Sequence, residues 1–491
     1  MVPNRCPWAQ MASAHPGDPG QDLLGAGVRG VVEVGAGRGV QAEQCVPHRA
    51  AHQVQLVDRL GEAPSHRGGG LDEGLEAGGD GGHGDLRGTG GGGGGRRDLF
   101  GSTTCVHCRA MQGWDAPALR SPLLVCPETK QRVTVCSLAE AAERMGVSDL
   151  VPRRGNQSKP IGATSTVMLR DDHRCAYPVV GHVPVLLVPE QLLAERDAPS
   201  VDAIDIADQR YAESYEERAY YNEAARSQTD RMEAAPESAG LAHLLEFTQE
   251  QRLAFPLPRR TWVDATYEPV AQWEAFRHLA PLAGKTVLQL GGKGIHAVRF
   301  LLAGAAQAWV MSPMVEELQH GRALAGRYGV EDRYRCVAGI AEEMPFADEA
   351  FDAVYSDSCV HHMVTELAAA ECRRTLGPGG RFAAVEPWRA PFYRWGIKIF
   401  GKREKGVHCQ PMTSERAAPF FAVFEEASVA HHGALTRYPL LALAQLGLEL
   451  RPQQVYRITK FDDACCSVLP RVRRMGSSSA ILARRGGGHE Q

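Results

Sequence analysis

The chain has 491 residues, of which 44% are apolar and 23% are charged, and its formal net charge is -4. This composition is normal for a soluble globular protein of roughly two to four domains. The lack of a basic surplus argues against a nucleic-acid-binding protein. No apolar stretch reaches the roughly 20 residues of a membrane span, and the N-terminus lacks the apolar core of a signal peptide. We therefore expect a cytoplasmic protein.

The 13 cysteines are odd in number and irregularly spaced, which favours reduced thiols over a disulfide framework. Cys105 and Cys108 form one CxxC pair, but a structural zinc site usually needs a second pair at a suitable spacing. We therefore expect no metal site.

Residues 1–110 have the composition of a disordered, low-complexity extension. Glycine dominates residues 68–97, and no hydrophobic period of a helix or strand survives there, so little apolar surface is available to offset the entropy of ordering. One hypothesis is that Met111 is the true start and the preceding residues are a gene-model extension. A glycine-rich stretch, Val31–Gly39, has the pattern of a nucleotide-binding loop and is followed by Asp58. It lacks the strand and helix that such a loop requires, so we favour coincidence.

Residues 119–193 predict a small β-rich domain, because short β-branched runs alternate with Pro and Gly. Within it, SLAEAAERM at 137–145 predicts a short helix with Ser137 as its N-cap and Glu140 completing a capping box. The pattern LLVCP…YPVVGHVPVLLV resembles the small zinc-ribbon-like domain of the tRNA-methyltransferase activator family. That family's first zinc knuckle has the form CPxC, whereas this chain has Cys126-Pro-Glu-Thr129. The resemblance therefore implies the fold with one zinc ligand missing.

Residues 204–280 are expected to form a helical linker or cap ahead of the next domain. Its polar, helical part carries four tyrosines, which either pack the helix against that domain or line a substrate pocket. They are Tyr211, Tyr215, Tyr220 and Tyr221.

A strand, a glycine-rich turn and a helix follow in Lys285–Gly294 and His296–Ala303, the context in which a glycine loop approaches a nucleotide. Further strands are predicted at Ala308–Met311 and Arg335–Ala338. The sequence MPFADEAFDAVYSD at 344–357 then predicts a fourth strand. LGPGGRFAAVE at 376–386 predicts a Pro-Gly turn and a fifth strand.

These ordered motifs resemble the class I S-adenosylmethionine-dependent methyltransferases, and most of all those of ubiquinone and menaquinone biosynthesis. The resemblance implies an α/β fold over residues 281–485: a Rossmann-like, seven-stranded sheet with helices on both faces. It places a substrate insertion at 388–436. A terminal antiparallel hairpin is expected from Val455–Phe461 and Ser479–Ala483.

The resemblance also implies S-adenosylmethionine as cofactor, bound beyond the carboxyl ends of the parallel strands. Three acids that the family uses there map to Gln289, Val310 and Ile340, and Lys293 displaces one loop glycine. Gln289 and Ser312 can still supply hydrogen bonds, and Glu342 lies near the adenine position. The expected cofactor-binding residues are Gln289, Gly291, Gly292, Gly294, Met311, Ser312, Ala341, Glu342, Ser356 and Asp357.

Two side chains at the same rim are candidate catalytic residues. His362, like its neighbour His361, follows the fourth strand and has the chemistry of a general base. Glu386 ends the fifth strand and is placed to orient a substrate hydroxyl. The aromatic and basic residues that follow it suit an amphipathic acceptor or a peripheral contact with a membrane.

The leading interpretation is a methyltransferase acting on a small-molecule or lipid-like acceptor. One alternative is a non-catalytic scaffold that kept the fold and lost the cofactor acids. Another is an RNA methyltransferase, suggested by the activator-like domain and opposed by the net charge of -4. The sequence does not identify the acceptor, the methylated atom or the oligomeric state, and no nucleic-acid partner is expected.

Overall fold

The computed structural model describes residues 119, 121–153, 165–198, 209–234, 269–391, 393, 410–446, 448, 450 and 452–487. The predicted extension at 1–110, with its Val31–Gly39 stretch and the Cys105–Cys108 pair, lies outside the described residues. So does most of the first half of the predicted insertion at 388–436. Within the described residues, no helix combines the length and the hydropathy needed to cross a bilayer.

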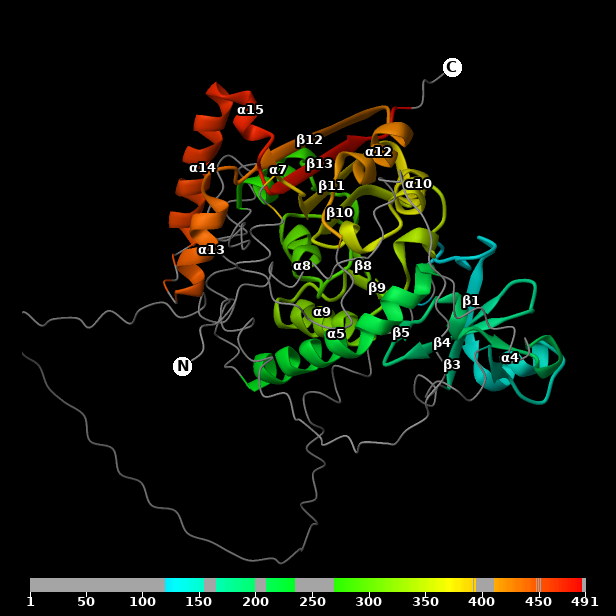
Figure 1. Cartoon of the computed structure of the whole chain (residues 1–491). Helices are drawn as coiled ribbons and strands as arrows, with labels where there is room; N and C mark the ends of the chain where they lie inside the picture. Colours follow the sequence, from blue (N-terminus) through cyan, green and yellow to red (C-terminus); the bar gives the residue numbers. More distant parts are fainter. Residues whose placement is uncertain are drawn as a thin grey trace, which may run out of the picture.

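A seven-stranded mixed sheet forms the centre of the larger domain (Figure 1). Its spatial order is β12-β13-β11-β10-β7-β8-β9. The strands from β11 to β9 are parallel, whereas β13 runs antiparallel to both of its neighbours. This topology confirms the expected α/β fold. The strands are β7 (Thr286–Leu290), β8 (Gln307–Met311), β9 (Tyr334–Val337), β10 (Phe351–Asp357), β11 (Leu376–Pro387), β12 (Glu426–His432) and β13 (Ser478–Arg484).

Helices cover both faces of this sheet, so its strands are apolar on both sides. One core contains Val287 of β7 with Phe276 and Phe300 of the covering helices. The other contains the adjacent Leu288 with Phe420. The helices of the first face are α7 (Pro269–Leu279), α8 (Ile295–Leu302) and α9 (Val315–Arg327), and those of the second are α10 (Thr365–Thr375) and α12 (Ser414–Val423).

The predicted terminal hairpin is wrong in its first strand. Val455–Phe461 lies in helix α14 (Pro452–Val468), and the true antiparallel partner of β13 is β12, inside the segment predicted as a substrate insertion. Val455, Thr459 and Cys466 are buried at helical spacing, so a period near 3.6 decided the element despite the β-branched residues. Helices α13 (Arg437–Gln445) and α15 (Pro470–Arg473) flank α14.

The N-terminal domain is an antiparallel sheet with one helix. Its strand order is β1-β3-β4-β6-β2, and β5 pairs with β4. Helix α4 (Leu138–Arg144) begins as predicted, because Ser137 Oγ accepts a hydrogen bond of 3.1 Å from the Glu140 amide. The strands are β1 (Val133–Ser137), β2 (Val151–Pro152), β3 (Thr166–Arg170), β4 (Ala176–Val180), β5 (Val183–Pro184) and β6 (Leu192–Leu193).

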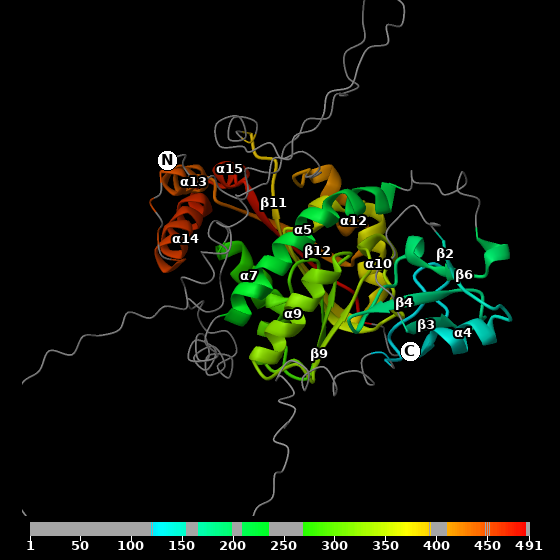
Figure 2. The same cartoon turned by 90° about the horizontal axis from the view of Figure 1, so that it is seen from below.

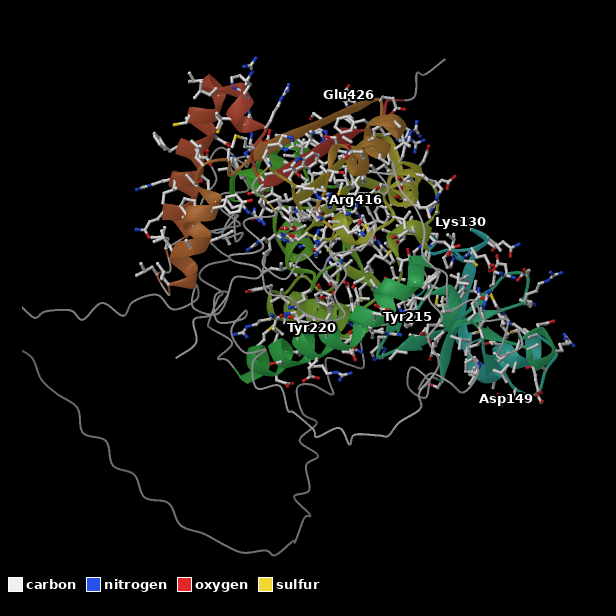
Figure 3. All side chains as sticks on the ribbon, in the orientation of Figure 1. Lys130, Asp149, Tyr215, Tyr220, Arg416 and Glu426 are labelled. Atoms are coloured by element: carbon white, nitrogen blue, oxygen red, sulfur yellow. The ribbon has the colours of Figure 1, made fainter. Side chains whose placement is uncertain are left out.

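The small domain adds its chain to the open edge of the large sheet. The Ala338 amide, just after β9, donates to the Pro184 carbonyl at 2.8 Å, and the Ala338 carbonyl accepts from the Leu186 amide at 2.9 Å. A second contact joins Lys130 Nζ to Glu371 Oε2 of α10 at 2.9 Å, and Figure 3 shows Lys130 at the boundary between the two domains. The two domains therefore share backbone and side-chain contacts.

Helix α5 (Gln209–Ala234) crosses from the small domain along α9, as both views show (Figures 1 and 2). Polar contacts hold it there. Arg226 forms an ion pair with Glu316, and Thr229 Oγ1 lies 2.9 Å from His320 Nδ1. Helix α5 lies within the segment 204–280 and crosses the carboxyl edge of β8 and β9, whereas α7 of the same segment packs on a face of the sheet.

Candidate functional site

The turn between β7 and α8 requires its glycines. Gly291, Gly292 and Gly294 have φ values of 71°, 71° and 77°, in the left-handed region that favours glycine. A Cβ on Gly291 would stand 2.3 Å from Cys359 Sγ, and one on Gly294 would stand 2.3 Å from Tyr334 Oη. The loop therefore packs closely against the protein and presents bare backbone at the end of β7. Strand β7 has β8 on one side and β10 on the other, and the chain crosses over the sheet between β9 and β10. The carboxyl end of β7 is therefore a topological switch point, where sheets of this kind bind ligands.

Gln289, expected to contact the cofactor, uses both ends of its amide inside the loop. Its Oε1 accepts from the Ala297 amide at 2.7 Å, and its Nε2 donates to the Gly291 carbonyl at 2.8 Å. The side chain is only 3% exposed. Gln289 therefore fixes the glycine turn to the first turn of α8.

The buried carboxylate of Glu317 lies close to Val310, the position at which the family has an acid at the end of the second strand. Val310 points into the core, but Ser312 Oγ donates to Glu317 Oε2 at 3.0 Å. Burial raises the pKa of the Glu317 carboxyl, and the nearby Lys293 ammonium opposes that shift. The sequence reasoning missed Glu317. The available signal was its place in the first turn of α9, where an acid meets the helix dipole.

The loop after β9 brings the next predicted residues to the same edge. Ala341 is buried in the short 3-10 helix Ala341–Glu343, and Glu342 Oε1 accepts from the Val364 amide at 2.9 Å. Tyr211 Oη of α5 donates to Glu343 Oε2 at 2.6 Å. Helix α5 is therefore tied directly to the loop that follows β9.

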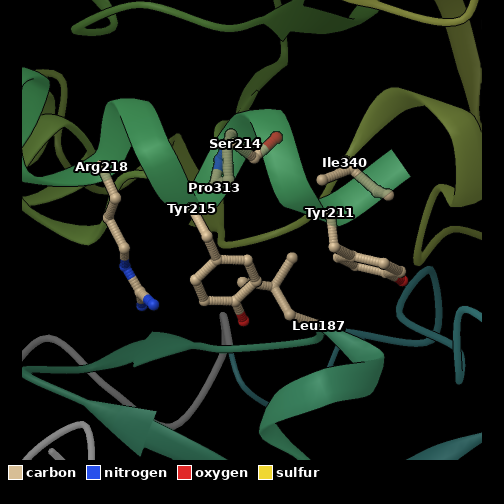
Figure 4. Close-up of a pocket in the computed structure, with 7 residues that line it drawn as sticks. All are labelled: Leu187, Tyr211, Ser214, Tyr215, Arg218, Pro313 and Ile340. Atoms are coloured by element: carbon tan, nitrogen blue, oxygen red, sulfur yellow. The ribbon is translucent and has the colours of Figure 1, made fainter. Parts of the chain in front are cut away.

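A narrow crevice, too tight to hold a water molecule, lies between α5, the small domain and this edge (Figure 4). Tyr211, Tyr215 and Arg218 project from α5 towards the segment that carries Leu187. Tyr211 and Tyr215 line this crevice and also pack against the core of the large domain, as the packing alternative predicts. The lining residues are Leu187, Tyr211, Ser214, Tyr215, Arg218, Pro313 and Ile340.

Asp357, at the end of β10, has polar contacts with side chains of three elements. Its Oδ2 accepts from Gln272 Nε2 of α7 at 3.0 Å and from Tyr355 Oη at 3.2 Å, and it lies 3.3 Å from His296 Nε2 of α8. The neighbouring Ser356 is fully buried, and its hydroxyl meets no partner among the described residues. Met311 is likewise buried, and its carbonyl accepts from the Gly291 amide at 2.7 Å.

The two candidate catalytic residues have different surroundings. Both carboxylate oxygens of Glu386 are used internally: Oε1 accepts from the Cys359 and Val360 amides at 3.1 and 2.8 Å, and Oε2 lies 2.7 Å from His361 Nδ1. Burial raises the pKa of Glu386 to about 7, and burial lowers the pKa of His361 well below its usual range. Glu386 and His361 are thus joined by a short hydrogen bond in a fully buried place.

His362 lies further out, at the rim. Its ring packs against that of His361 at an interplanar angle of 40°, with centroids 4.2 Å apart, and its Nδ1 lies 3.2 Å from Glu217 Oε1 of α5. The His362 side chain is 19% exposed, whereas that of Glu217 is 6% exposed. Glu217 is thus a further residue of the site that the sequence reasoning missed, since it comes from a helix far away in the chain.

A polar cluster surrounds Cys126, at the position of the related family's first zinc knuckle. Cys126 Sγ lies 3.2 Å from Tyr177 Oη and accepts from Arg170 Nη1 at 3.8 Å. A hydrogen bond with Cys175 is the largest cause that lowers the pKa of the Cys126 thiol to about 4. Within the described residues, no three His, Cys, Asp or Glu side chains gather in a way that could hold a metal ion.

Comparison with known proteins agrees with this geometry. Residues 288–384 match the family model of a methyltransferase domain. Over 131 residues the chain is 37% identical to the ubiquinone/menaquinone biosynthesis C-methyltransferase of Dinoroseobacter shibae, which covers 26% of this chain and 48% of that protein. Over 124 residues it is 32% identical to the tRNA U34 carboxymethyltransferase of Chromohalobacter salexigens, which covers 24% of this chain and 37% of that protein. The chain thus spans about half of the first relative and less of the second.

Among solved structures, the geranyl diphosphate C-methyltransferase of Streptomyces coelicolor aligns at 15% identity over 44% of this chain and 78% of that one, with a TM-score of 0.33. The match to the family model and the relatives' sequences carry the assignment. Residues 288–384 form a class I S-adenosylmethionine-dependent methyltransferase domain.

Proposed function

We propose that the chain transfers a methyl group from S-adenosylmethionine to a small-molecule or lipid-like acceptor at the carboxyl edge of β7–β10. The observation that carries this proposal is the glycine turn at the switch point. Three of its glycines have left-handed backbone conformations, and two of them pack against side chains that leave no space for a Cβ. The names of the relatives add support, since one is a quinone-biosynthesis C-methyltransferase.

The residues present fit this cofactor. Gly291, Gly292 and Gly294 shape a turn with positive φ at the end of β7, and Gly291 and Gly294 pack against Cys359 and Tyr334. The buried Ser312–Glu317 pair offers a carboxylate beside the position of the missing strand-end acid. We assign to Glu317 and Ser312 the recognition of the ribose hydroxyls that Val310 cannot provide, because a carboxylate and a hydroxyl both accept hydrogen bonds. When bound, the cofactor supplies an electrophilic methyl group on a sulfonium.

On the acceptor side we assign different roles to the two candidate residues. His362 is placed at the rim with Glu217 to take a proton from an acceptor that must lose one. Glu386 is a positioning residue, because its oxygens hold the Cys359–Val360 amides and His361. The chain's contribution is alignment of the reactants and exclusion of water, in which α5 covers the edge.

The small β domain resembles an activator of methyltransferases in its sequence pattern, and we propose that it acts as a built-in support of this one. It forms backbone hydrogen bonds with Ala338, which begins the loop that carries Ile340 and Ala341. A domain fixed at that point stabilises the loop in a single conformation.

Calorimetric titration of S-adenosylmethionine into the full chain tests the cofactor assignment, with Gly291→Arg as the blocked variant. Saturable binding that Gly291→Arg abolishes is the expected result, and no binding by the wild-type chain would leave a scaffold that kept only the fold. Incorporation of tritiated methyl groups is then compared between a total lipid extract, a soluble metabolite extract and transfer RNA. Labelling of lipid or small molecules supports the proposal, whereas labelling of transfer RNA alone would assign the enzyme to RNA.

A further inference from the structure

The exposed apolar side chains of the described residues are unevenly distributed. Nine large apolar side chains are exposed, and six of them fall between residues 435 and 469. Scattered single residues of this kind are normal on a surface, but a concentration in one short segment marks an interaction site. The six are Leu435, Leu446, Leu448, Phe461, Val468 and Leu469.

Helix α14 has a face that no described element covers. Val455, Thr459, Asp462 and Cys466 form its buried face. The opposite face presents Phe461 and Val468, which are 69% and 79% exposed, and the chain continues into Leu469 at 58%. A helix on the surface of a globular protein usually has charged or polar residues on its exposed face. Large apolar side chains at these positions therefore indicate a contact with another partner.

The acidic residues of α14 are withdrawn from that exposed face. Asp462 is buried and accepts from the Leu435 and Thr436 amides at the start of α13. Asp463 Oδ1 lies 2.9 Å from His432 Nδ1 of β12. Both carboxylates therefore hold α14 to the rest of the domain.

The charges that remain on the exposed face are all basic. From Gln454 to Arg474 the exposed charged side chains are Arg457, Lys460, Arg471 and Arg474, and none of the exposed positions in this stretch is an Asp or a Glu. Within the described part of the chain, none of these four forms an ion pair. Apolar and basic groups are thus combined on one surface, although the whole chain has a net charge of -4.

We propose that this surface, the α14–α15 face formed by Arg457, Lys460, Phe461, Val468, Leu469, Arg471 and Arg474, docks on an anionic lipid bilayer. Phe461, Val468 and Leu469 insert between the headgroups while the basic side chains meet lipid phosphates, the arrangement of interfacial amphipathic helices. A nucleic acid also attracts basic groups, but protruding aliphatic side chains gain nothing from a phosphate backbone. Figure 1 shows α14 and α15 at the end of the molecule opposite the small domain, so the described part of that domain does not cover them.

Vesicle flotation of the full chain tests this proposal. Vesicles of phosphatidylcholine are compared with vesicles of equal parts phosphatidylcholine and phosphatidylglycerol. The chain is expected to float with the anionic vesicles only, and added salt is expected to weaken the binding, since charged surfaces are screened.

Two variants separate the apolar from the basic contribution. Val468→Asp with Leu469→Asp, and separately Arg471→Gln with Arg474→Gln, are each expected to weaken binding to anionic vesicles by about tenfold or more. Leu367→Asp with Phe421→Asp is the control, because these apolar side chains are also exposed, at 40% and 42%, but lie on α10 and α12. Circular dichroism confirms that each variant is folded.

Three outcomes would overturn the proposal. These are no binding of the wild-type chain to anionic vesicles, equal binding by all variants, and displacement of the vesicles by a polyuridine oligonucleotide. The last would assign the surface to nucleic acid. None of these readouts depends on methyl transfer, so the test is independent of the proposed activity.

Discussion

Glu386 and His361 are joined by a hydrogen bond of 2.7 Å between Oε2 and Nδ1, and neither side chain has exposed surface. The Glu386 carboxylate also accepts hydrogen bonds from the amides of Cys359 and Val360. The end of β11 is therefore linked directly to the turn that follows β10. Because the rings of His361 and His362 are in contact, the position of His362 at the rim depends on this buried pair.

Replacing Glu386 tests that dependence. Glu386→Ala leaves the two amides and His361 Nδ1 without their acceptor in a buried place, and we expect a loss of about 3–5 kcal/mol in the free energy of unfolding. Glu386→Gln keeps an acceptor oxygen of the same shape and should cost about 1 kcal/mol. Urea unfolding followed by circular dichroism measures both. Equal losses in the two variants would contradict the role given to the carboxylate.

The glycine turn gives a second prediction. Gly291→Ala places a Cβ at positive φ and against Cys359 Sγ, so it should destabilise the fold and lower the affinity for S-adenosylmethionine by more than about tenfold. Gly284→Ala is the matched control, because Gly284 has a φ of 75° but no described atom lies within 4 Å of the place that a Cβ would take. It should cost only the conformational strain of about 1–2 kcal/mol and leave affinity unchanged.

A double variant separates the clash from the strain. Cys359→Ala in the Gly291→Ala background removes the sulfur atom and should restore part of the lost stability and affinity. If the double variant binds no better than Gly291→Ala alone, the contact with Cys359 is not the reason for glycine at this position.

The stability of the C-terminal helices should depend on pH through His432. Burial lowers the pKa of His432, but its hydrogen bonds to Asp463 and Glu274 outweigh this effect, and the pKa lies above its usual value of 6.5. The folded state therefore binds the proton more tightly than the unfolded chain. The added stability is complete below pH 6.5 and is lost as the pH rises through the folded pKa.

His432→Gln should flatten this dependence, and thermal unfolding between slightly acid and alkaline pH measures it. The other charged groups near this cluster are His431, Lys460, Arg473 and Arg474. His173→Asn, at an exposed turn of the small domain, is the control and should keep the wild-type slope. An unchanged slope in His432→Gln would show that the titrating group lies elsewhere.

The contact between the two domains gives a fourth prediction. Lys130 Nζ donates to Glu371 Oε2 at 2.9 Å and to the Met344 carbonyl at 3.1 Å, and its side chain is 33% exposed. Lys130→Met should cost about 1 kcal/mol of stability, since partial exposure weakens an ion pair. Arg144→Met removes a more exposed pair with Glu140 in the same domain and should cost about 0.5 kcal/mol or less. Chemical denaturation compares the two, and equal costs would argue against a structural role for Lys130.

The parts of the fold that neighbouring residues specify could be predicted from the sequence. The glycine turn at 291–294 sits between a strand and a helix as expected, and the motifs at 344–357 and 376–386 form neighbouring strands of one sheet. These succeed because turn residues and short apolar runs carry their own conformational preference.

The parts that failed depend on distant partners. Val455–Phe461 has β-branched residues, but it forms a helix whose buried positions, at helical spacing, are set by contacts with α13 and β12. The role of Glu217 depends on α5 folding back over His362, and the carboxylate of Glu317 takes a place that the family pattern assigns to a strand end. Such pairings are tertiary, and residue spacing does not encode them.

The bonds between Ala338 and the small domain also bear on how the molecule avoids associating with itself. Strand β9 is the last strand of the sheet, and an open strand edge offers unpaired amides and carbonyls to any neighbouring chain. At Ala338 the segment from Pro184 to Leu186 already occupies both groups. The small domain thus occupies this edge of the sheet at the point where β9 ends, and we expect its loosening to be seen first as aggregation.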